Sequence, residues 1–192
     1  MNNPTLHVVV GSTRPGRVGP QVAAWFADVA RADRRFAVEM VDLAEVDLPI
    51  YDEPEHPSVG RYTHDHTRQW SELVGRADAV AFVIPEYNHS FNAATKNAID
   101  FLHSEWRHKP IGFVSYGGVA AGTRAVQALK PVFLSVKAIP VLESVNIPAI
   151  GTHVSEGRFI APPGLSTAAE SMLDELNRLC LTMRLRRQQP RL

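Results

Sequence analysis

Five short apolar runs recur along the chain, separated by longer segments with helical spacing. The runs cover residues 6–10, 36–43, 79–85, 111–116 and 138–143. Three of them are continuously apolar rather than alternating, which is typical of parallel strands whose two faces are both covered by helices. We therefore predict five parallel β-strands connected by helices.

The segments between these runs show the apolar periodicity of amphipathic helices. One such stripe consists of Val18, Val22, Phe26 and Val29, and another of Trp70, Leu73 and Val74. A C-terminal helix is predicted after Gly164, where Thr167 and Glu170 have the spacing of a capping box. The Pro-rich and His-containing stretch 48–66 is predicted to be a surface loop.

This alternation of strands and helices predicts a single α/β domain over residues 1–192. The usual solution for five parallel strands is a doubly wound sheet in the order 2-1-3-4-5, with right-handed crossovers. Such sheets bind ligands at the carboxyl ends of the first, third and fourth strands. Those ends carry the loops "GSTRPGRVG", "PEYNHS" and "SYGGVAAG", which we expect to meet in one cleft.

Composition limits the partners and the compartment. Lys plus Arg equals Asp plus Glu at 20 each, so the overall charge does not attract nucleic acid or an anionic membrane. The single cysteine excludes an internal disulfide and a multi-cysteine zinc site. No apolar run approaches the roughly 18 residues of a membrane span, and the N-terminus lacks a signal-peptide pattern. We expect a cytoplasmic protein whose anion site, if it has one, is local.

The first loop, residues 11–19, nearly matches the phosphate-binding motif G-x-x-x-x-G-K-[ST]. Arg17 stands in place of the lysine, and Val18 in place of the hydroxyl residue that binds Mg²⁺. Two guanidinium groups, two hydroxyls and the N–H groups of a helix start suit a phosphate monoester rather than a triphosphate or a dinucleotide. The alternative is an ordinary glycine turn with solvated arginines.

The second loop supplies an aromatic ring and two amides, at Tyr87, Asn88 and Asn92, before a helix that is predicted to begin near residue 93. We expect the backbone N–H groups of Glu86, Tyr87 and Asn88 to point at the acceptor edge of a planar heterocycle. An ordinary polar strand-to-helix turn is the alternative.

The third loop contains glycines at 117, 118 and 122, which let the backbone approach a ring or a phosphate closely. A structural glycine turn explains this loop equally well when it is taken alone.

Together, "GSTRPGRVG", "PEYNHS…KNAID" and "SYGG" resemble the NADPH-dependent FMN reductase family of flavodoxin-like quinone, azo-dye and chromate reductases, over roughly residues 5–180. The resemblance implies a flavodoxin-like fold with FMN as cofactor. It implies that the FMN phosphate is held by Ser12, Arg14 and Arg17, with the backbone of Val18 and Gly19. It also implies that the isoalloxazine ring is lined by Pro85, Glu86, Tyr87, Asn88, Ser115, Gly117 and Gly118. Many members have Ser and Asn in place of Arg17 and Gly19, and Pro in place of Asn92.

The resemblance implies a function in which no side chain acts as a catalyst, because FMN carries the hydride chemistry itself. None of the eight histidines has the spacing of a metal site. In this hypothesis NADPH or NADH reduces FMN, backbone donors near Asn88 and Gly117 stabilise charge on the reduced ring, and a small acceptor takes two electrons by ping-pong exchange. Quinones, flavins, azo compounds and oxyanions are candidate acceptors.

Two other functions fit the same three loops. A flavodoxin-like electron carrier would bind FMN without oxidising NAD(P)H, but such carriers use a strongly acidic face, whereas this chain is formally neutral. A nucleotide- or sugar-phosphate-binding module would bind AMP or a sugar phosphate and stay colourless.

A homodimer or homotetramer is expected from the segment "ATKNAIDFLHSEW", read as one helix. Its apolar residues Ile99, Phe101, Leu102 and Trp106 would be available to a partner, and the family implied by the resemblance usually completes its flavin site across a dimer interface. The alternative is that this stripe belongs to the core of one chain. Lys96 and Asp100, four residues apart, would form a surface ion pair or be part of that interface.

Overall fold

The computed structural model describes residues 3–187 and contains the predicted parallel sheet. The strand order is β2-β1-β3-β4-β5, and every neighbouring pair is parallel. The strands are β1 (Thr5–Val10), β2 (Ala37–Asp42), β3 (Ala79–Pro85), β4 (Pro110–Tyr116) and β5 (Ile139–Ile147). The fold class and strand order predicted from the sequence are therefore confirmed.

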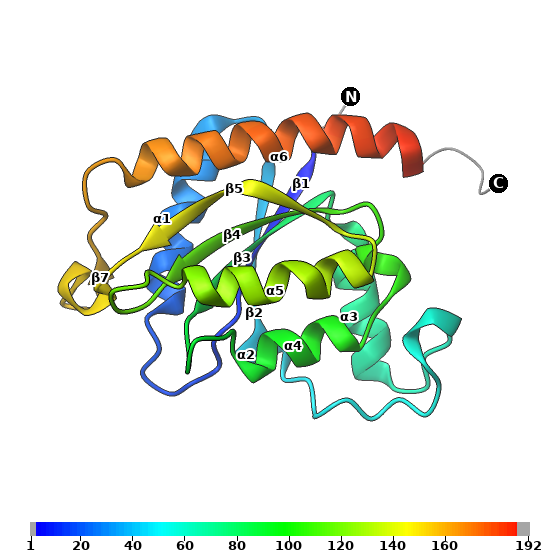
Figure 1. The fold of residues 1–192 in the computed structure, drawn as a ribbon. Coiled ribbons are helices and arrows are strands. Elements are labelled where there is room, and N and C mark those ends of the chain that lie inside the picture. Colours follow the sequence, from blue (N-terminus) through cyan, green and yellow to red (C-terminus); the bar gives the residue numbers. More distant parts are fainter. Residues whose placement is uncertain (1–2, 188–192) are drawn as a thin grey trace.

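Helices cover both faces of this sheet (Figure 1). One face packs against α1 (Gly19–Asp33) and α6 (Leu165–Arg187), and the other against α3 (Asp65–Arg76), α4 (Ala93–Asp100) and α5 (Thr123–Ser135). Shorter elements are α2 (Leu43–Val46) and the 3₁₀ turns at Pro57–Val59, Ser104–Trp106 and Ile150–His153. A small hairpin of β6 (Val154–Ser155) and β7 (Arg158–Phe159) precedes α6. Within the described residues, no helix is both long and apolar enough to cross a membrane.

The continuous apolar runs became the buried centre of the sheet. Every residue of β3 and β4 is buried, because each of these strands has a neighbour on both sides and helices on both faces. β5 lies at the edge and extends four residues beyond the predicted run. In this extension the buried Val145 and Ile147 alternate with the half-buried polar residues Ser144 and Asn146, so a continuous apolar run did not mark the end of the strand.

The segment "ATKNAIDFLHSEW" does not form one helix. α4 ends at Asp100, and a separate 3₁₀ turn holds Trp106. Ile99, Phe101, Leu102 and Trp106 are each at most 1% exposed. The expectation that they are available to a partner was wrong, because the chain itself buries them, while the expected ion pair of Lys96 and Asp100 is present. The homodimer or homotetramer stays a prediction.

The capping box expected at Thr167 and Glu170 was also wrong. α6 begins at Leu165, two residues before Thr167. The carbonyl of Thr167 accepts a hydrogen bond from the Ser171 hydroxyl one turn later, so Thr167 lies inside the helix. Gly164, with φ +83°, provides the turn that starts the helix.

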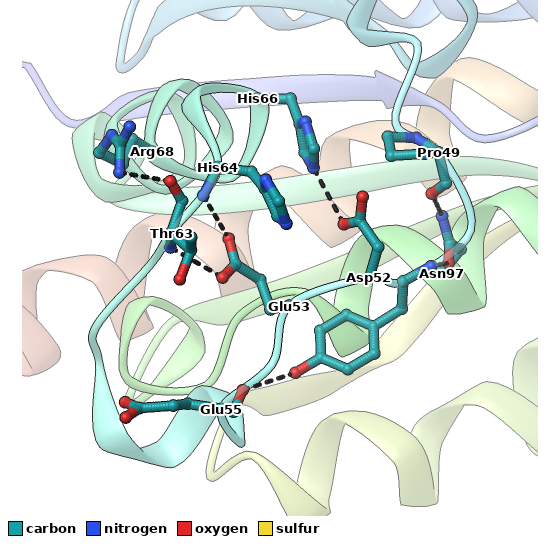
Figure 2. A network of polar contacts seen from close by, with 10 residues as sticks. Pro49, Asp52, Glu53, Glu55, Thr63, His64, His66, Arg68 and Asn97 are labelled. Atoms are coloured by element: carbon teal, nitrogen blue, oxygen red, sulfur yellow. Dashed lines mark hydrogen bonds and ion pairs between the residues drawn. The ribbon is translucent and has the colours of Figure 1, made fainter.

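The predicted surface loop 48–66 ends at residue 64, because α3 begins at Asp65. The loop 48–64 is firmly attached to the core (Figure 2). The Asn97 side chain on α4 holds it at two points, accepting from the Tyr51 N–H at 2.9 Å and donating to the Pro49 carbonyl at 2.6 Å. The Tyr51 hydroxyl then donates to the Glu55 carbonyl. Asn97 of the "KNAID" motif is thus a clamp for this loop.

A buried carboxylate closes the far end of the loop. Glu53 is only 8% exposed and accepts hydrogen bonds from the N–H groups of Thr63 and His64, at 2.8 and 3.0 Å (Figure 2). Burial by itself would raise the pKa of Glu53, but these hydrogen bonds and the nearby Thr67 hydroxyl outweigh it and lower the pKa to about 2. The charged form of Glu53 is therefore the one that stabilises the fold.

The free energy of unfolding should fall in acid because of this group. A pKa of about 2 in the folded protein, against about 4.3 in an unfolded chain, contributes at most about 3 kcal/mol, present above pH 4.5 and lost as the pH falls toward 2. Urea unfolding between pH 7 and pH 2.5 measures this loss. Glu53→Gln should be less stable at pH 7 and show a flatter pH profile, whereas Glu72→Gln on the exposed side of α3 should keep the wild-type profile. A profile for Glu53→Gln as steep as that of the wild type would contradict this assignment.

Candidate functional site

Three loops meet at one edge of the sheet. β1, β3 and β4 are consecutive neighbours, and their last residues are brought into line by the register, which pairs Val10 with Val83 and Pro85 with Tyr116. The loops that follow these strands therefore lie side by side at the carboxyl edge, as predicted from the sequence.

The first loop leads directly into α1. It turns through a hydrogen bond of 3.1 Å from the Arg17 N–H to the Arg14 carbonyl. Ser12 is fully buried, whereas Thr13 and Arg14 are exposed. Within residues 3–187, the Arg14 guanidinium has no hydrogen-bond or ion-pair partner. The loop thus keeps one positive charge free for a ligand.

The second guanidinium of this loop is partly committed to the protein. Nη2 of Arg17 lies 2.5 Å from Oδ2 of Asp42, the last residue of β2. The other oxygen of Asp42 accepts the Ala44 N–H and caps α2. Nε of Arg17 is buried and has no partner among the described residues. The sequence did not reveal this ion pair, which orients Arg17 and leaves one of its donors unused.

The start of α1 has the features of an anion site. Val18 is at the N-cap position and provides no side-chain hydrogen bond, and the first turn contains no acidic residue. The first N–H groups of a helix have no partner within the helix and carry partial positive charge. Together with the free Arg14 beside them, these groups favour a bound anion.

The second loop forms a tight turn that uses two of the N–H groups predicted to meet a ligand. The N–H of Tyr87 donates to the Ser90 carbonyl and that of Ser90 donates back, both at 2.9 Å. Asn88 and His89 lie between them with φ of 49° and 66°, as in a type I′ turn. The Glu86 N–H donates to the Tyr116 carbonyl at 3.0 Å.

The prediction that Glu86 and Tyr87 direct their N–H groups at a heterocycle was therefore wrong, because the fold uses both groups. Within the described part of the chain, the Asn88 N–H has no hydrogen-bond partner. It is the one donor of the three that the turn leaves for a ligand. Pro85, the last residue of β3, is buried beneath this turn.

The aromatic ring of Tyr87 connects the first two loops. Its hydroxyl lies 3.0 Å from the Ser12 hydroxyl, while 37% of the residue is exposed. The ring is thus fixed at its polar end and accessible along its body. This is the arrangement of a stacking surface next to an anion site.

Asn92 locks the first two loops together, a role that its sequence position did not reveal. It is 6% exposed, its Nδ2 donates to the Gly11 carbonyl at 2.6 Å, and its Oδ1 accepts from the Thr95 hydroxyl at 2.9 Å. A Cβ on Gly11 would lie 2.5 Å from that hydroxyl oxygen, so only glycine allows this close approach. Asn92 is therefore a structural clamp and not part of the exposed ring surface.

The third loop is fixed from below by Ser115. This residue is fully buried, and its Oγ lies 2.8 Å from the Ala121 carbonyl and 2.9 Å from Oδ1 of Asn146. The N–H of Gly117 donates to the Ile147 carbonyl at 3.2 Å. The fold therefore uses the Ser115 hydroxyl and the Gly117 N–H, both predicted to face the ring.

Gly118 is exposed at the same loop, and its N–H has no recorded partner within residues 3–187. The donor that the third loop has available at the carboxyl edge is therefore the N–H of Gly118, and not that of Gly117 as predicted.

An ion pair ties the second loop to the third. The carboxylate of Glu86, whose side chain is 9% exposed, receives the Arg124 side chain at 2.8 Å and the Arg124 N–H at 3.2 Å. Arg124 is in the first turn of α5, so Glu86 also caps that helix. Glu86 therefore positions two loops with its side chain.

Tyr116, the last residue of β4, points its side chain toward the start of α1. The residue is 5% exposed and belongs to the core cluster on the face covered by α1 and α6. Within the described residues, its hydroxyl makes no hydrogen bond of standard geometry. The sequence singled out the "SYGG" glycines but not this tyrosine.

These features fit the phosphate and ring of FMN. A flavin phosphate requires donors and positive charge without a metal, and the loop provides the free Arg14, the unused Nε of Arg17 and an uncapped helix start. The ring requires a flat apolar surface and a few backbone donors, which the exposed Tyr87 and the N–H groups of Asn88 and Gly118 provide.

Removing the clamp between the loops should destabilise the fold. Asn92→Asp replaces the buried donor to the Gly11 carbonyl by a carboxylate, so the free energy of unfolding should fall by about 1–3 kcal/mol, the usual penalty for an unsatisfied buried group. Urea unfolding at pH 7 measures the change. Gln127→Glu, the same exchange on the exposed face of α5, should change stability by less than about 0.5 kcal/mol. Equal stability of Asn92→Asp and the wild type would show that the clamp has no energetic importance.

Known proteins share both the sequence pattern and the fold. Residues 4–152 match the NADPH-dependent FMN reductase family. The chain is 38% identical over 149 residues to an NAD(P)H-dependent FMN reductase of Schizosaccharomyces pombe, covering 76% of this chain and 74% of that one. It is 33% identical over 123 residues to a quinone reductase of Pseudomonas putida, covering 62% of each.

Among solved structures, the fold is similar to that of FerB, a flavoenzyme NAD(P)H:(acceptor) oxidoreductase from Paracoccus denitrificans. The TM-score is 0.66 at 20% identity, over 95% of this chain and 98% of that one. The sequence match to the family covers all three loops of the site. The chain therefore belongs to the NADPH-dependent FMN reductase family, flavodoxin-like oxidoreductases that use NAD(P)H and FMN.

Proposed function

We propose that this protein passes two electrons from NAD(P)H, through bound FMN, to a quinone, a flavin or a similar small acceptor. The observation that carries the proposal is the combination of the free Arg14 guanidinium at the uncapped start of α1 with the exposed ring of Tyr87 beside it. A phosphate and a flat ring on one small molecule match these two features.

Each site residue has a role in this proposal. The groups that hold the phosphate are the side chains of Ser12, Arg14 and Arg17 and the backbone of Val18 and Gly19. The groups that face the ring are the side chain of Tyr87 and the backbone of Asn88 and Gly118. Behind them, the residues that position the loops without facing the ring are Pro85, Glu86, Ser115 and Gly117.

The chemistry requires little more from the protein. FMN, when bound, supplies the hydride acceptor and donor. This chain orients it, neutralises its phosphate and leaves one side accessible. Val119, at the tip of the third loop, is fully exposed, and Tyr87 is 37% exposed, so the rim of the site is apolar and open to a flat acceptor such as a quinone. The name of the Pseudomonas putida relative, quinone reductase, supports this class of acceptor.

The formal neutrality of the chain favours an enzyme over an electron carrier. A carrier docks onto large protein partners through a field of one sign, whereas this chain balances 20 basic against 20 acidic residues. Apart from Arg14, the charged side chains described at the site are paired, Arg17 with Asp42 and Arg124 with Glu86.

The absorption spectrum tests the proposal directly. The purified protein, loaded with FMN and freed of excess, should show a flavin spectrum that bleaches when NADPH or NADH is added without oxygen. A stable flavin spectrum that neither nucleotide bleaches would identify a carrier. A protein that stays colourless and retains AMP would identify a nucleotide-binding module.

Steady-state kinetics test the order of the two half-reactions. NAD(P)H and the acceptor would use the same open side of the site in turn. Plots of reciprocal rate against the reciprocal of the NAD(P)H concentration should therefore be parallel lines at different benzoquinone concentrations. The same assay with free FMN as acceptor compares quinone and flavin. Lines that intersect would show a ternary complex and contradict the exchange mechanism.

A further inference from the structure

A buried hydroxyl without a hydrogen bond of standard geometry lies beside the start of α1. Tyr116 is 95% buried, and its hydroxyl makes no hydrogen bond of standard geometry within the described residues. The Ser12 hydroxyl lies close enough to lower the pKa of Tyr116, but its hydrogen bond of standard geometry is with Tyr87. A buried hydroxyl without a partner costs free energy, so native structures rarely keep one unless a ligand or a water uses it.

The position of this hydroxyl is set by Gly19, the first residue of α1. A Cβ on Gly19 would lie 3.0 Å from the Tyr116 hydroxyl oxygen and 3.1 Å from a methyl carbon of Val10. The phenol therefore occupies the space that a side chain at position 19 would need. Glycine at 19 lets a donor from β4 reach the start of the helix from inside the core.

Other unused donors surround the same point. Nε of Arg17 is buried without a partner, Arg14 has none within residues 3–187, and α1 has no side-chain cap. Among the described residues, the acidic side chain recorded at this loop is Asp42, which is occupied by Arg17 and the Ala44 N–H. The cluster thus has an excess of donors and positive charge, which is the complement of a phosphate.

We propose that Tyr116 is a further phosphate ligand, whose hydroxyl donates to the FMN phosphate at the start of α1 and which acts as a pair with Gly19. The inference rests on the proposed function, because it takes FMN as the ligand. It adds a contact from β4 to a site otherwise built from the loop after β1.

The ionisation state of Tyr116 agrees with a donor role. Burial raises the pKa of the phenol and the neighbouring Tyr87 adds to this effect, while Ser12, Arg14 and Arg17 act in the opposite direction. Since the net shift is upward, the hydroxyl keeps its proton at neutral pH and is available to donate to an anion.

The test compares ligands with and without the phosphate. Dissociation constants of FMN and riboflavin are measured by flavin fluorescence for the wild type and for Tyr116→Phe. The variant should bind FMN about tenfold more weakly, the effect of one hydrogen bond to a charged group, and riboflavin as the wild type does. Arg14→Ala is the positive control, since it should also weaken FMN binding alone.

A second tyrosine controls for the loss of a phenolic hydroxyl elsewhere. The Tyr62 hydroxyl donates to Glu105 at 2.8 Å, in the part of the fold that holds the loop 48–64. Tyr62→Phe should lower the melting temperature of the FMN-free protein without changing the FMN dissociation constant. Tyr116→Phe should melt at the wild-type temperature or above, because it removes an unsatisfied group.

The pairing with Gly19 is tested by a double-mutant cycle. Gly19→Ala places a methyl group against the Tyr116 hydroxyl, so it should lower the melting temperature of the FMN-free protein, and by less when combined with Tyr116→Phe. Equal losses in both backgrounds would overturn the pairing.

The outcomes separate this inference from the proposed function. Tyr116 is not a phosphate ligand if Tyr116→Phe binds FMN as tightly as the wild type does. The same conclusion follows if the variant weakens the binding of FMN and riboflavin by the same factor. In both cases the wild type still binds FMN, and the proposed function stands. If the wild type binds neither flavin, both are overturned.

Discussion

The hydrogen bond from the Asn92 amide to the Gly11 carbonyl is the contact on which the geometry of the site depends. Gly11 directly follows β1, and Asn92 closes the loop after β3. The parallel sheet brings these two strand ends together, but it does not fix the loops beyond them. The loops are fixed by the hydrogen bond of 2.6 Å from the buried Asn92 amide to the Gly11 carbonyl. This contact requires that residue 11 has no Cβ.

Further contacts connect the second loop to the first and third loops. Tyr87 is placed by the turn it forms with Ser90, and its hydroxyl contacts Ser12 of the first loop. Glu86 reaches the opposite way to Arg124 and fixes the third loop. Three loops with few regular hydrogen bonds of their own thereby become one rigid surface, which reduces the entropy lost when a ligand binds.

The sequence predicted the parallel sheet and its strand order well, because strands buried on both faces appear in the sequence as apolar runs. Strands β3 and β4, buried on both faces, appear as continuous apolar runs, and the alternation with helices limits the topology to a few solutions. It predicted the ends of elements poorly. The edge strand β5 carries an exposed Leu142 and a buried Val145, so its length depends on pairing with β4 and not on an apolar run.

The structure brings the three predicted loops together, but it uses several of their residues differently from the prediction. Ser115 and the N–H groups of Glu86, Tyr87 and Gly117 have the chemistry of ligand donors, but the fold uses them. No sequence pattern shows whether a donor is already bonded, because the partners, such as the carbonyls of Tyr116 and Ile147, come from distant parts of the chain. The sequence did not single out Tyr116, because a tyrosine at the end of a buried strand has the pattern of a core residue.

The donors that the fold leaves unused fall into two groups at the carboxyl edge of the sheet. The fold uses the side chains of Ser12, Glu86, Asn92 and Ser115. Among the donors without a hydrogen bond inside the described residues are the Arg14 guanidinium, Nε of Arg17, the Tyr116 hydroxyl and the N–H groups of Asn88 and Gly118. They divide between the start of α1, where charge is needed, and the tips of two loops, where a ring needs only neutral donors. A molecule with a phosphate at one end and a polar heterocycle at the other would satisfy both groups at once, which supports the proposed binding of FMN at this edge of the sheet.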